Sequence, residues 1–387
     1  MKINYIAPIG QMSGYGEFAR NVISGLCESG ADVKIQPLQF AGTSQAETDL
    51  VNSWVGGRFK DLIGRHLKPT VNIINIIPPL FKANKQPGVL NVGFTMFETD
   101  RIPASWVESC NAMDAVLVPC SHNRDFFKRS GVEVPPYCVP PAIDFKPFDG
   151  RVRPPRAQRS IENPFVFYSI FQWSDRKNPA GLLRAYWATF TGRDDVVLRL
   201  KLYVQNPAEL VAINAEIATL KKSARLRHYP KVEIISDMMT QQQMIDFHLA
   251  GDCFVSASHG EGLGLCLIEA MALETPVIST AYSGPADFLD GRLMSILDPE
   301  TRNALIVRHT KSPAMCSGPN GHFYEANMMW GEPDLEHLME CMWLAKNDSH
   351  LCAAIAKRAA QDVRRKYDAK TCTDYMLGTL QSLIEKK

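Results

Sequence analysis

Two glutamates, Glu261 and Glu269, lie eight positions apart in the stretch HGEGLGLCLIEAMALETPVIST, which runs from His259 to Thr280. The preceding CFVSA predicts a buried strand, the glycines predict a loop, and LCLIEAMAL predicts a helix. In a doubly wound sheet, ligands bind at this edge, where the start of a helix offers N–H groups to a phosphate. A carboxylate there accepts hydrogen bonds from hydroxyl groups, which sugars and riboses supply. The pattern indicates a sugar or nucleotide site, although two surface glutamates explain it about equally well.

Arg176 and Lys177 form a second candidate element, in FQWSDRKNPAGLL. They lie between a predicted strand and a helix that Asn178 and Pro179 are expected to begin. Cations at such a position suit the neutralisation of phosphates. Taken alone, a solvated basic turn is the favoured explanation.

A glycine-rich segment, GQMSGYG at 10–16, follows the first predicted strand. It resembles a phosphate-binding loop, but it fits neither G-x-G-x-x-G nor the G-K-[ST] ending of a P-loop. A tight turn explains it as well. What favours a binding site is the shared placement of the three elements, since each lies at a strand-to-helix junction.

The elements that would position these residues form two series of alternating strands and helices, typical of doubly wound parallel sheets. The first series has apolar strands at 3–7, 33–38, 71–77, 91–95 and 115–119, with one helix closed by Gly30 and another capped by Ser121 and ended by Gly131. The second has strands at 165–170, 196–203, 232–235, 253–257 and 276–279, with helices at 179–190, 240–250 and 265–273 and a mostly helical tail from Asp334. Prolines and arginines crowd residues 135–164, which we interpret as a linker between domains.

Composition limits the function. The chain has 387 residues, 45% of them hydrophobic and 21% charged, which suits two domains with substantial cores. A formal net charge of +1 gives no global field for nucleic acids or anionic membranes. Ten cysteines without a C-x-x-C motif argue against zinc clusters and favour a reducing compartment. The start MKINYIAPIG lacks the pattern of a signal peptide, so we expect a cytoplasmic protein, and a peripheral position at the inner membrane face stays open.

The combination resembles the retaining glycosyltransferases of the GT-B fold, in particular the family 4-like group with an E-x7-E motif. The most specific match is EGLGLCLIE with the following AMALETPVIST; GYGEFARN, MFETDRIPASW, VPPAID and SDRKNPAGLLRAY support it, so the match covers most of the chain. The resemblance implies two Rossmann-like parallel-sheet domains facing across a cleft. They would be an acceptor-side domain at 1–150, a linker at 151–163, a nucleotide-sugar domain at 164–365, and a final helix at 366–387 that crosses back to the N-terminal domain.

The resemblance also implies an enzyme of the hexosyltransferase type, which moves a sugar from a UDP-sugar, or next a GDP-sugar, to an acceptor with retained configuration. Glu261 would contact the sugar hydroxyls and Glu269 the ribose hydroxyls. Lys177, with Arg176 as helper, would neutralise the leaving diphosphate. The other donor-binding residues implied are Gly14, Tyr15, Gly16, His259, Gly262, Leu263, Gly264 and Leu265. A solvent-facing loop position is an equal alternative for His259.

Two departures from the family pattern concern the reacting centre. Many relatives have a glycine-arginine pair about six residues before the lysine, where this chain has Ile170 and Phe171. Many also carry a histidine in the N-terminal domain, where the segment MFETD places Glu98. We expect Glu98 to bind a polar acceptor, and a structural carboxylate is nearly as well supported.

The sequence contains no D-x-D pair, so we expect no metal or other cofactor, with the diphosphate neutralised by cations and helix dipoles. As acceptor we favour a glycan or lipid-linked glycan, with nucleic acid open. The basic stretch at 221–231 favours a solvated helix end over an anion site. Two other functions stay open: a catalytically silent partner protein that binds nucleotide sugar or glycan, and a sugar-nucleotide epimerase.

Overall fold

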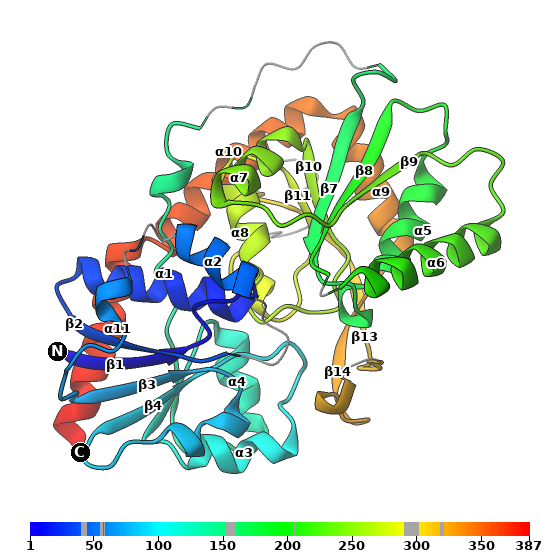
Figure 1. Ribbon diagram of the computed structural model, residues 1–387. Helices are drawn as coiled ribbons and strands as arrows, with labels where there is room; N and C mark the ends of the chain where they lie inside the picture. The colour runs from blue at the N-terminus through cyan, green and yellow to red at the C-terminus, as the bar shows by residue number, and fades with distance from the viewer. Residues whose placement is uncertain are drawn as a thin grey trace. The chain divides into compact units, whose positions relative to one another are not determined.

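The chain forms two compact units, Met1–Pro147 with Arg364–Lys387, and Phe148–Val363. The structure, a computed structural model, describes residues 1–39, 45–54, 57, 59–151, 153, 160–204, 206–289, 302–317 and 321–387. Each unit contains a six-stranded parallel sheet with helices packed on it (Figure 1), as the alternating pattern predicted.

The first unit has the strand order β2-β1-β3-β4-β5-β6, and every neighbouring pair is parallel. Its strands are β1 (Lys2–Ala7), β2 (Asp32–Pro37), β3 (Val71–Asn75), β4 (Leu90–Phe94), β5 (Ala115–Val118) and β6 (Pro136–Cys138). Strands β3, β4 and β5 are buried along their whole length, as expected where helices cover both faces. Strand β6 lies inside the segment that we interpreted as linker, so that part of the interpretation is wrong: the prolines obscured a short edge strand.

The helices of this unit are α1 (Gly14–Glu28), α2 (Gln45–Trp54), α3 (Ala104–Asn111), α4 (Ser121–Arg129) and α11 (Ala369–Lys386). Two predicted helix starts are wrong. Helix α1 already begins at Gly14, because Ser13 accepts a hydrogen bond from the Gly16 N–H. Helix α4 is capped by the extended residue Cys120, so Ser121 is its first helical residue. The predicted ends hold, since Gly30 and Gly131 have the positive φ angles of +78° and +97° that follow a helix end.

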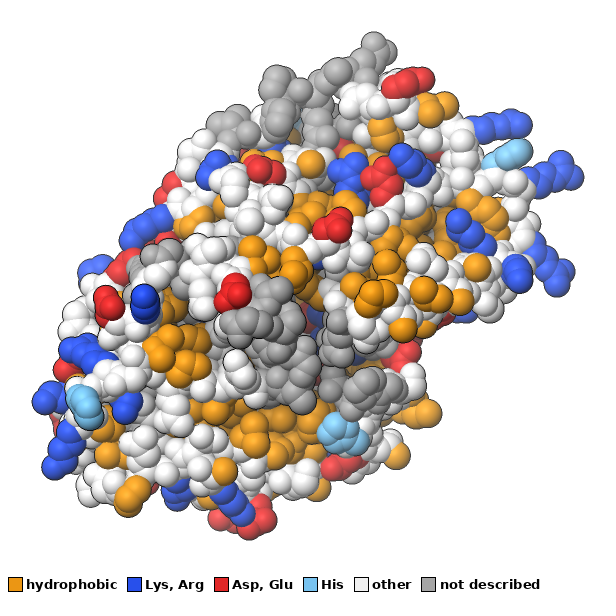
Figure 2. Space-filling view, viewed as in Figure 1, with side chains coloured by type: hydrophobic (Ala, Val, Ile, Leu, Met, Phe, Trp, Pro, Cys, Tyr) orange, Lys and Arg blue, Asp and Glu red, His pale blue; other side chains and the backbone are white. Residues whose placement is uncertain are grey.

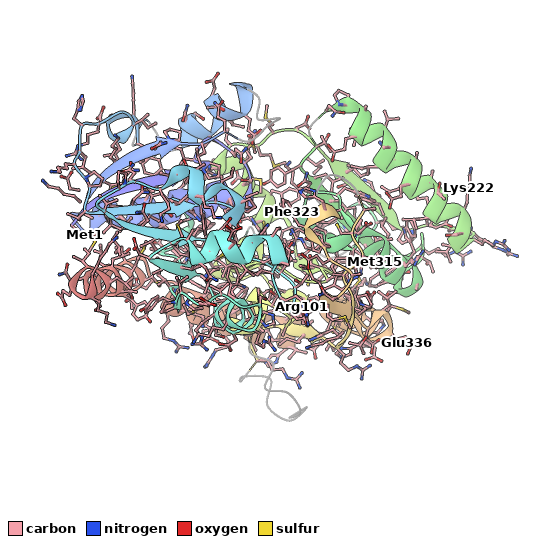
Figure 3. All side chains as sticks on the ribbon, turned by 90° about the horizontal axis from the view of Figure 1, so that it is seen from below. Met1, Arg101, Lys222, Met315, Phe323 and Glu336 are labelled. Atoms are coloured by element: carbon pink, nitrogen blue, oxygen red, sulfur yellow. The ribbon has the colours of Figure 1, made fainter. Side chains whose placement is uncertain are left out.

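The second unit has the strand order β12-β11-β10-β7-β8-β9. Its strands are β7 (Phe165–Phe171), β8 (Val196–Leu202), β9 (Lys231–Ile235), β10 (Cys253–Ser256), β11 (Val277–Thr280) and β12 (Leu305–Val307). A separate antiparallel pair, β13 (His309–Pro313) and β14 (Met329–Pro333), follows β12 and was not predicted. Figure 3 labels Met315 and Phe323, which lie on the connection between these two strands.

The helices of the second unit are α5 (Pro179–Thr189), α6 (Pro207–Ala224), α7 (Gln241–Ala250), α8 (Leu265–Ala272), α9 (Leu335–Asn347) and α10 (Ser349–Lys366), the last of which runs into the first unit. Asn178 caps α5 as predicted, with its side chain accepting from the Gly181 N–H. Among the described helices, none combines the length and apolar character that a membrane span requires.

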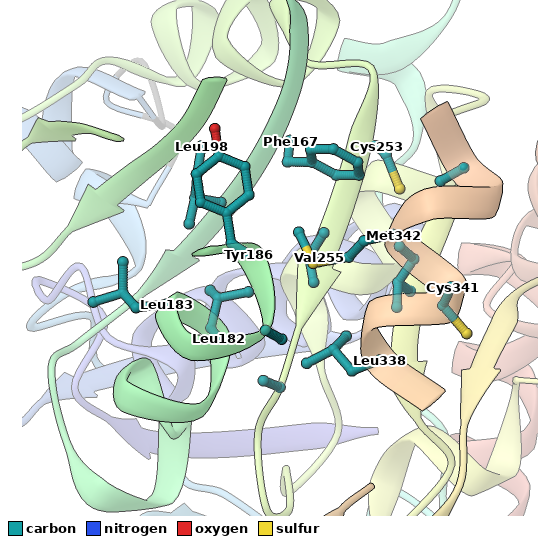
Figure 4. Packing of buried hydrophobic residues seen from close by; sticks show 14 of the residues in the cluster. Phe167, Leu182, Leu183, Tyr186, Leu198, Cys253, Val255, Leu338, Cys341 and Met342 are labelled. Atoms are coloured by element: carbon teal, nitrogen blue, oxygen red, sulfur yellow. The ribbon is translucent and has the colours of Figure 1, made fainter. Parts of the chain in front are cut away.

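A hydrophobic core lies between the sheet of the second unit and helices α5 and α9 (Figure 4). Phe167 from β7 and Tyr186 from α5 are fully buried there, and Met342 reaches the same core from α9. Each fully buried side chain of this size contributes roughly 1.5–3 kcal/mol. This packing fixes the strands whose ends carry the candidate site.

The surface of the second unit is basic near the end of α6. Figure 2 shows Lys and Arg side chains gathered there, and Lys222 projects from this helix in Figure 3. Lys222, Arg225, Arg227, His228 and Lys231 are exposed. Cations at a helix C-terminus complement its dipole, which agrees with the interpretation as a solvated helix end.

Candidate functional site

The loops that follow β7 and β10 meet because these two strands are parallel neighbours, with Cys253 opposite Phe167. Parallel neighbours end at the same edge of a sheet. The loop after β7 contains the short 3-10 helix Asp175–Lys177, and the loop after β10 contains Glu261. The sheet order therefore joins the basic pair to the first glutamate of the E-x7-E motif, although the strands come from distant parts of the sequence.

Glu261 is the centre of this cluster. The Lys177 ammonium donates to both carboxylate oxygens, at 2.6 Å to Oε1 and 2.7 Å to Oε2. Arg176 donates from Nη1 to Oε2 at 3.0 Å and to the Gly260 carbonyl at 2.8 Å. The Ser258 hydroxyl donates to Oε1 at 2.7 Å. Each carboxylate oxygen thus accepts at least two hydrogen bonds.

The surroundings keep Glu261 ionised. Burial by itself would raise the pKa of this carboxyl, but the charges of Lys177 and Arg176 and the hydrogen bonds from Lys177 and Ser258 outweigh burial and lower the pKa to about 2. The side chain is 14% exposed, and those of Lys177 and Arg176 are 18% and 22% exposed. Two cations thus contact one anion, so this group of three side chains carries a net positive charge.

Glycines shape the backbone beside this cluster. Gly264 precedes α8 with a φ of +99°, a conformation that favours glycine. As the N-cap residue it has no side chain to accept hydrogen bonds from the first N–H groups of the helix. The Gly284 N–H donates to the Glu261 carbonyl at 2.9 Å. A Cβ on Gly284 would lie 2.6 Å from both the Gly262 carbonyl oxygen and the Leu263 Cα, so only glycine fits. These contacts hold the Gly262–Gly264 backbone close to the sheet edge.

Glu269 lies on the second turn of α8, and its side chain is 22% exposed. One carboxylate oxygen lies 3.5 Å from Nε2 of His248, a buried residue of α7. The other ring nitrogen of His248 shares a 2.9 Å hydrogen bond with the hydroxyl of Tyr168, which is fully buried on β7. Glu269 therefore contacts a buried histidine, and it is only partly exposed, unlike a glutamate on the solvent face of an amphipathic helix.

His259 is buried, so the expected alternative of a solvent-facing loop histidine is wrong. Its Nδ1 lies 3.0 Å from the Asp175 carbonyl oxygen, and its Nε2 lies 3.0 Å from Oε2 of Glu332 on β14. The ring stacks on Trp330, with centroids 4.3 Å apart and planes at 13°. Burial lowers the pKa of His259, and the charge of Glu332 and the contact with the Asp175 carbonyl act in the opposite direction.

The remaining predicted site residues lie in the first unit. Gly14, Tyr15 and Gly16 form the first turn of α1, which corrects the expectation of a loop. The Tyr15 hydroxyl lies 2.9 Å from the Thr95 hydroxyl and donates to the Met96 carbonyl at 3.2 Å. Burial raises the pKa of Tyr15, with a smaller contribution from the charge of Glu98. Tyr15 and Glu98 thus lie at one edge of the first sheet.

Sequence reasoning missed four residues that the fold brings to the Glu261 cluster or to its supports: Ser258, Gly284, Trp330 and Glu332. Ser258 lies three residues before Glu261, so its place beside the motif was the signal that could have identified it. Trp330 and Glu332 lie some 70 residues further on, within MMWGEP, and local pattern gives no sign of their contact with His259. Within the described part of the chain, no group of three or more His, Cys, Asp or Glu side chains is arranged to hold a metal ion.

Comparison with known proteins matches part of the chain to a family. Residues 155–292, which include the basic pair and both glutamates, match the model of the family described as "Glycosyl transferases group 1". TuaC of Bacillus subtilis (strain 168), named as a teichuronic acid biosynthesis glycosyltransferase, is 33% identical over 81 residues. The aligned stretch spans 21% of this chain and 21% of that protein.

Solved structures match over nearly the whole chain. Sucrose-phosphate synthase from Thermosynechococcus elongatus superposes with a TM-score of 0.67 at 13% identity, covering 100% of both chains. Anabaena HepE in complex with UDP-glucose superposes with a TM-score of 0.62 at 14% identity, covering 99% of this chain and 100% of that one. Identities this low show the fold alone. Residues 155–292 thus match the group 1 glycosyltransferase family, and the two parallel six-stranded sheets give this chain the GT-B fold.

Proposed function

We propose that this protein transfers a sugar from a nucleoside diphosphate sugar, with a UDP-sugar as the favoured donor, to a glycan or lipid-linked glycan. The observation that carries the proposal is the convergence of Lys177 and Arg176 on Glu261, beside the glycine-rich start of α8. The family match over 155–292 supports the reaction class. HepE of similar fold binds UDP-glucose, which supports the donor class.

The charges suit a diphosphate that leaves during the reaction. Arg176 and Lys177 together carry one positive charge more than Glu261 neutralises, and the start of α8 adds a positive dipole end. Charge-assisted contacts of this kind stabilise the negative charge that develops on the leaving group. In this proposal the neutralisation comes from side chains and helix ends, without a metal.

The two glutamates would contact different parts of the donor. Glu261 stays ionised at neutral pH because its pKa is about 2, and its oxygens would accept from sugar hydroxyls once Lys177 turns from the carboxylate to the diphosphate. Glu269 would accept from the ribose hydroxyls, with His248 behind it. The backbone of Gly262, Leu263, Gly264 and Leu265 would approach the sugar and diphosphate. The expected retention of configuration follows from the family resemblance and stays part of the proposal.

The first unit would supply the acceptor side. Gly14, Tyr15 and Gly16 at the start of α1 would approach the donor, and Glu98 would contact the acceptor. The placement of Tyr15 and Glu98 at one sheet edge supports this assignment. A cytoplasmic location, peripheral to a membrane where the acceptor is lipid-linked, completes the proposal.

The test is to incubate the purified protein with a panel of UDP- and GDP-sugars, to measure nucleoside diphosphate release with and without glycan acceptors, and to identify the recovered sugars by NMR. We expect release from one UDP-sugar and an α- or β-linked product that keeps the donor configuration. Binding without release would favour a silent binding protein. A new epimer in the recovered donor would favour an epimerase.

A further inference from the structure

His259 joins three segments of the second unit through every polar atom that it has. Its backbone N–H donates to the Arg176 carbonyl at 2.8 Å, and its own carbonyl accepts from the Gly331 N–H at 2.8 Å. Its ring contacts the Asp175 carbonyl on one side and Glu332 on the other. The loop with Glu261, the turn with the basic pair, and strand β14 therefore meet at one buried side chain.

A second contact fixes the β13–β14 connection to the same turn. The carboxylate of Asp175 accepts from the backbone N–H of Ser317 at 2.6 Å and from its hydroxyl at 2.5 Å. On the strands themselves, the Trp330 indole donates to the Ser312 hydroxyl at 3.0 Å, and that hydroxyl donates to Glu332 at 3.3 Å. The antiparallel pair is thus tied to the turn that carries Arg176 and Lys177.

The ring contacts of His259 depend on which of its nitrogens carry a proton. A carbonyl oxygen can only accept, so Nδ1 carries a hydrogen and donates to Asp175. A neutral ring would then present the Nε2 lone pair to Glu332 at 3.0 Å, which is repulsive if that carboxylate is ionised. The contact is therefore favourable only when Nε2 of His259 is protonated, and burial lowers the pKa of this ring below its ordinary value.

We propose that Glu332 is a positioning residue for the donor site, which acts through His259 to hold the Glu261 loop and the Arg176–Lys177 turn in register. The inference rests on the proposed function, and it adds β13 and β14 as a support of the donor site. Glu332 itself need not contact the donor, because its carboxylate is turned to His259 and Ser312.

The assignment predicts how two substitutions of Glu332 differ. Glu332→Leu removes the partner of Nε2 and should lower kcat/KM for the UDP-sugar by roughly 10- to 100-fold, the loss typical of a misplaced reacting group. Glu332→Gln should retain activity, because its amide donates to the Nε2 of a neutral ring. Lys311→Leu, an exposed position on β13, is the matched control and should behave as the unmodified protein.

A pH profile separates positioning from a merely structural role. The charged groups that face the ring are Glu332 from β14 and Asp175 from the turn. Burial lowers the pKa of His259 below its ordinary value of 6.5, so the ring loses the Nε2 proton as the pH rises from acidic towards neutral, and the activity of the unmodified protein should fall over that range. The Glu332→Gln variant has no such proton to lose, so its activity should fall less.

The experiment measures these rates, melting temperatures and pH profiles on the full chain, together with amide hydrogen exchange over 174–177 and 258–261. We expect faster exchange in Glu332→Leu, and unchanged exchange in Glu332→Gln and Lys311→Leu. The inference is overturned if Glu332→Leu matches the control, or if Glu332→Gln loses as much activity as Glu332→Leu. Absence of turnover in the unmodified protein would contradict the proposed function, and the exchange comparison would then decide the inference by itself.

Discussion

The ammonium of Lys177 lies 2.6 Å from one carboxylate oxygen of Glu261 and 2.7 Å from the other, although 84 positions separate the two residues. Lys177 is therefore already bound to the Glu261 carboxylate, and a diphosphate that binds at this edge would share the ammonium with it. Arg176 and Ser258 also bind Glu261, so the carboxylate keeps partners when Lys177 turns to a phosphate.

Replacing Lys177 by alanine should weaken UDP binding, because a charge-assisted contact to phosphate is lost. Such contacts contribute about 1.5–3 kcal/mol, which corresponds to a loss of affinity of roughly 10- to 150-fold. Isothermal calorimetry with UDP measures it, with Lys222→Ala on the exposed end of α6 as control. We expect a smaller loss for Arg176→Ala; a larger one would exchange the roles assigned to the two cations.

The two glutamates should differ in what they affect. Glu269→Ala should weaken binding of UDP and of the UDP-sugar alike, because ribose does not react. Glu261→Ala should bind UDP nearly normally and turn over far more slowly, because contacts to the sugar strengthen as the bond breaks. Calorimetry beside turnover rates checks both. The reverse pattern, with UDP affinity lost in Glu261→Ala and kept in Glu269→Ala, would mean that the pair has been assigned wrongly.

Glu261 should also contribute to stability in a pH-dependent way. Its folded-state pKa of about 2 lies below the ordinary value of 4.5, so its contribution is full above about pH 4.5 and is lost as the pH falls towards 2. A shift of this size corresponds to on the order of 3 kcal/mol. Urea unfolding of the unmodified protein and of Glu261→Gln should therefore show a stability difference that shrinks between about pH 5 and pH 3. A constant difference would argue against the depressed pKa.

Lys201 is buried on β8, where its ammonium donates to the Leu202 carbonyl at 3.0 Å and lies 4.4 Å from the Tyr203 ring centroid. Burial lowers its pKa to about 8. Because the unfolded chain holds this proton up to about pH 10.5, stability should rise with pH between about 8 and 10.5. Lys201→Met should remove that rise and stabilise the protein at neutral pH by up to about 3 kcal/mol. Urea unfolding at neutral and alkaline pH measures this; a less stable variant at neutral pH would show that the two ammonium contacts outweigh the cost of burial.

Turnover should survive treatment with EDTA, because the proposed donor site neutralises the diphosphate with Lys177, Arg176 and the start of α8. The measurement compares UDP release before and after chelation and dialysis. Activity that is lost and then restored by magnesium or manganese would show that these groups do not suffice.

Local features of this protein were predictable from sequence because they depend on neighbours along the chain. The apolar runs of β3, β4 and β5, the Asn178 cap of α5, and the position of Glu269 within α8 all follow from spacing and capping chemistry. Local reasoning failed where two signals competed. The prolines of 135–164 hid strand β6, and the glycines at 14 and 16 hid the first turn of α1, which Ser13 caps.

Only the tertiary structure decided which of these local features meet. The sheet order sets β10 beside β7 and leaves β8 and β9 on the far side of β7, which joins Glu261 to Lys177. The contact of His259 with Glu332 depends in turn on where β14 packs. Neither contact can be predicted from spacing or composition. The order of strands and the packing of distant segments depend on the free energy of the whole unit, and not on that of any one segment.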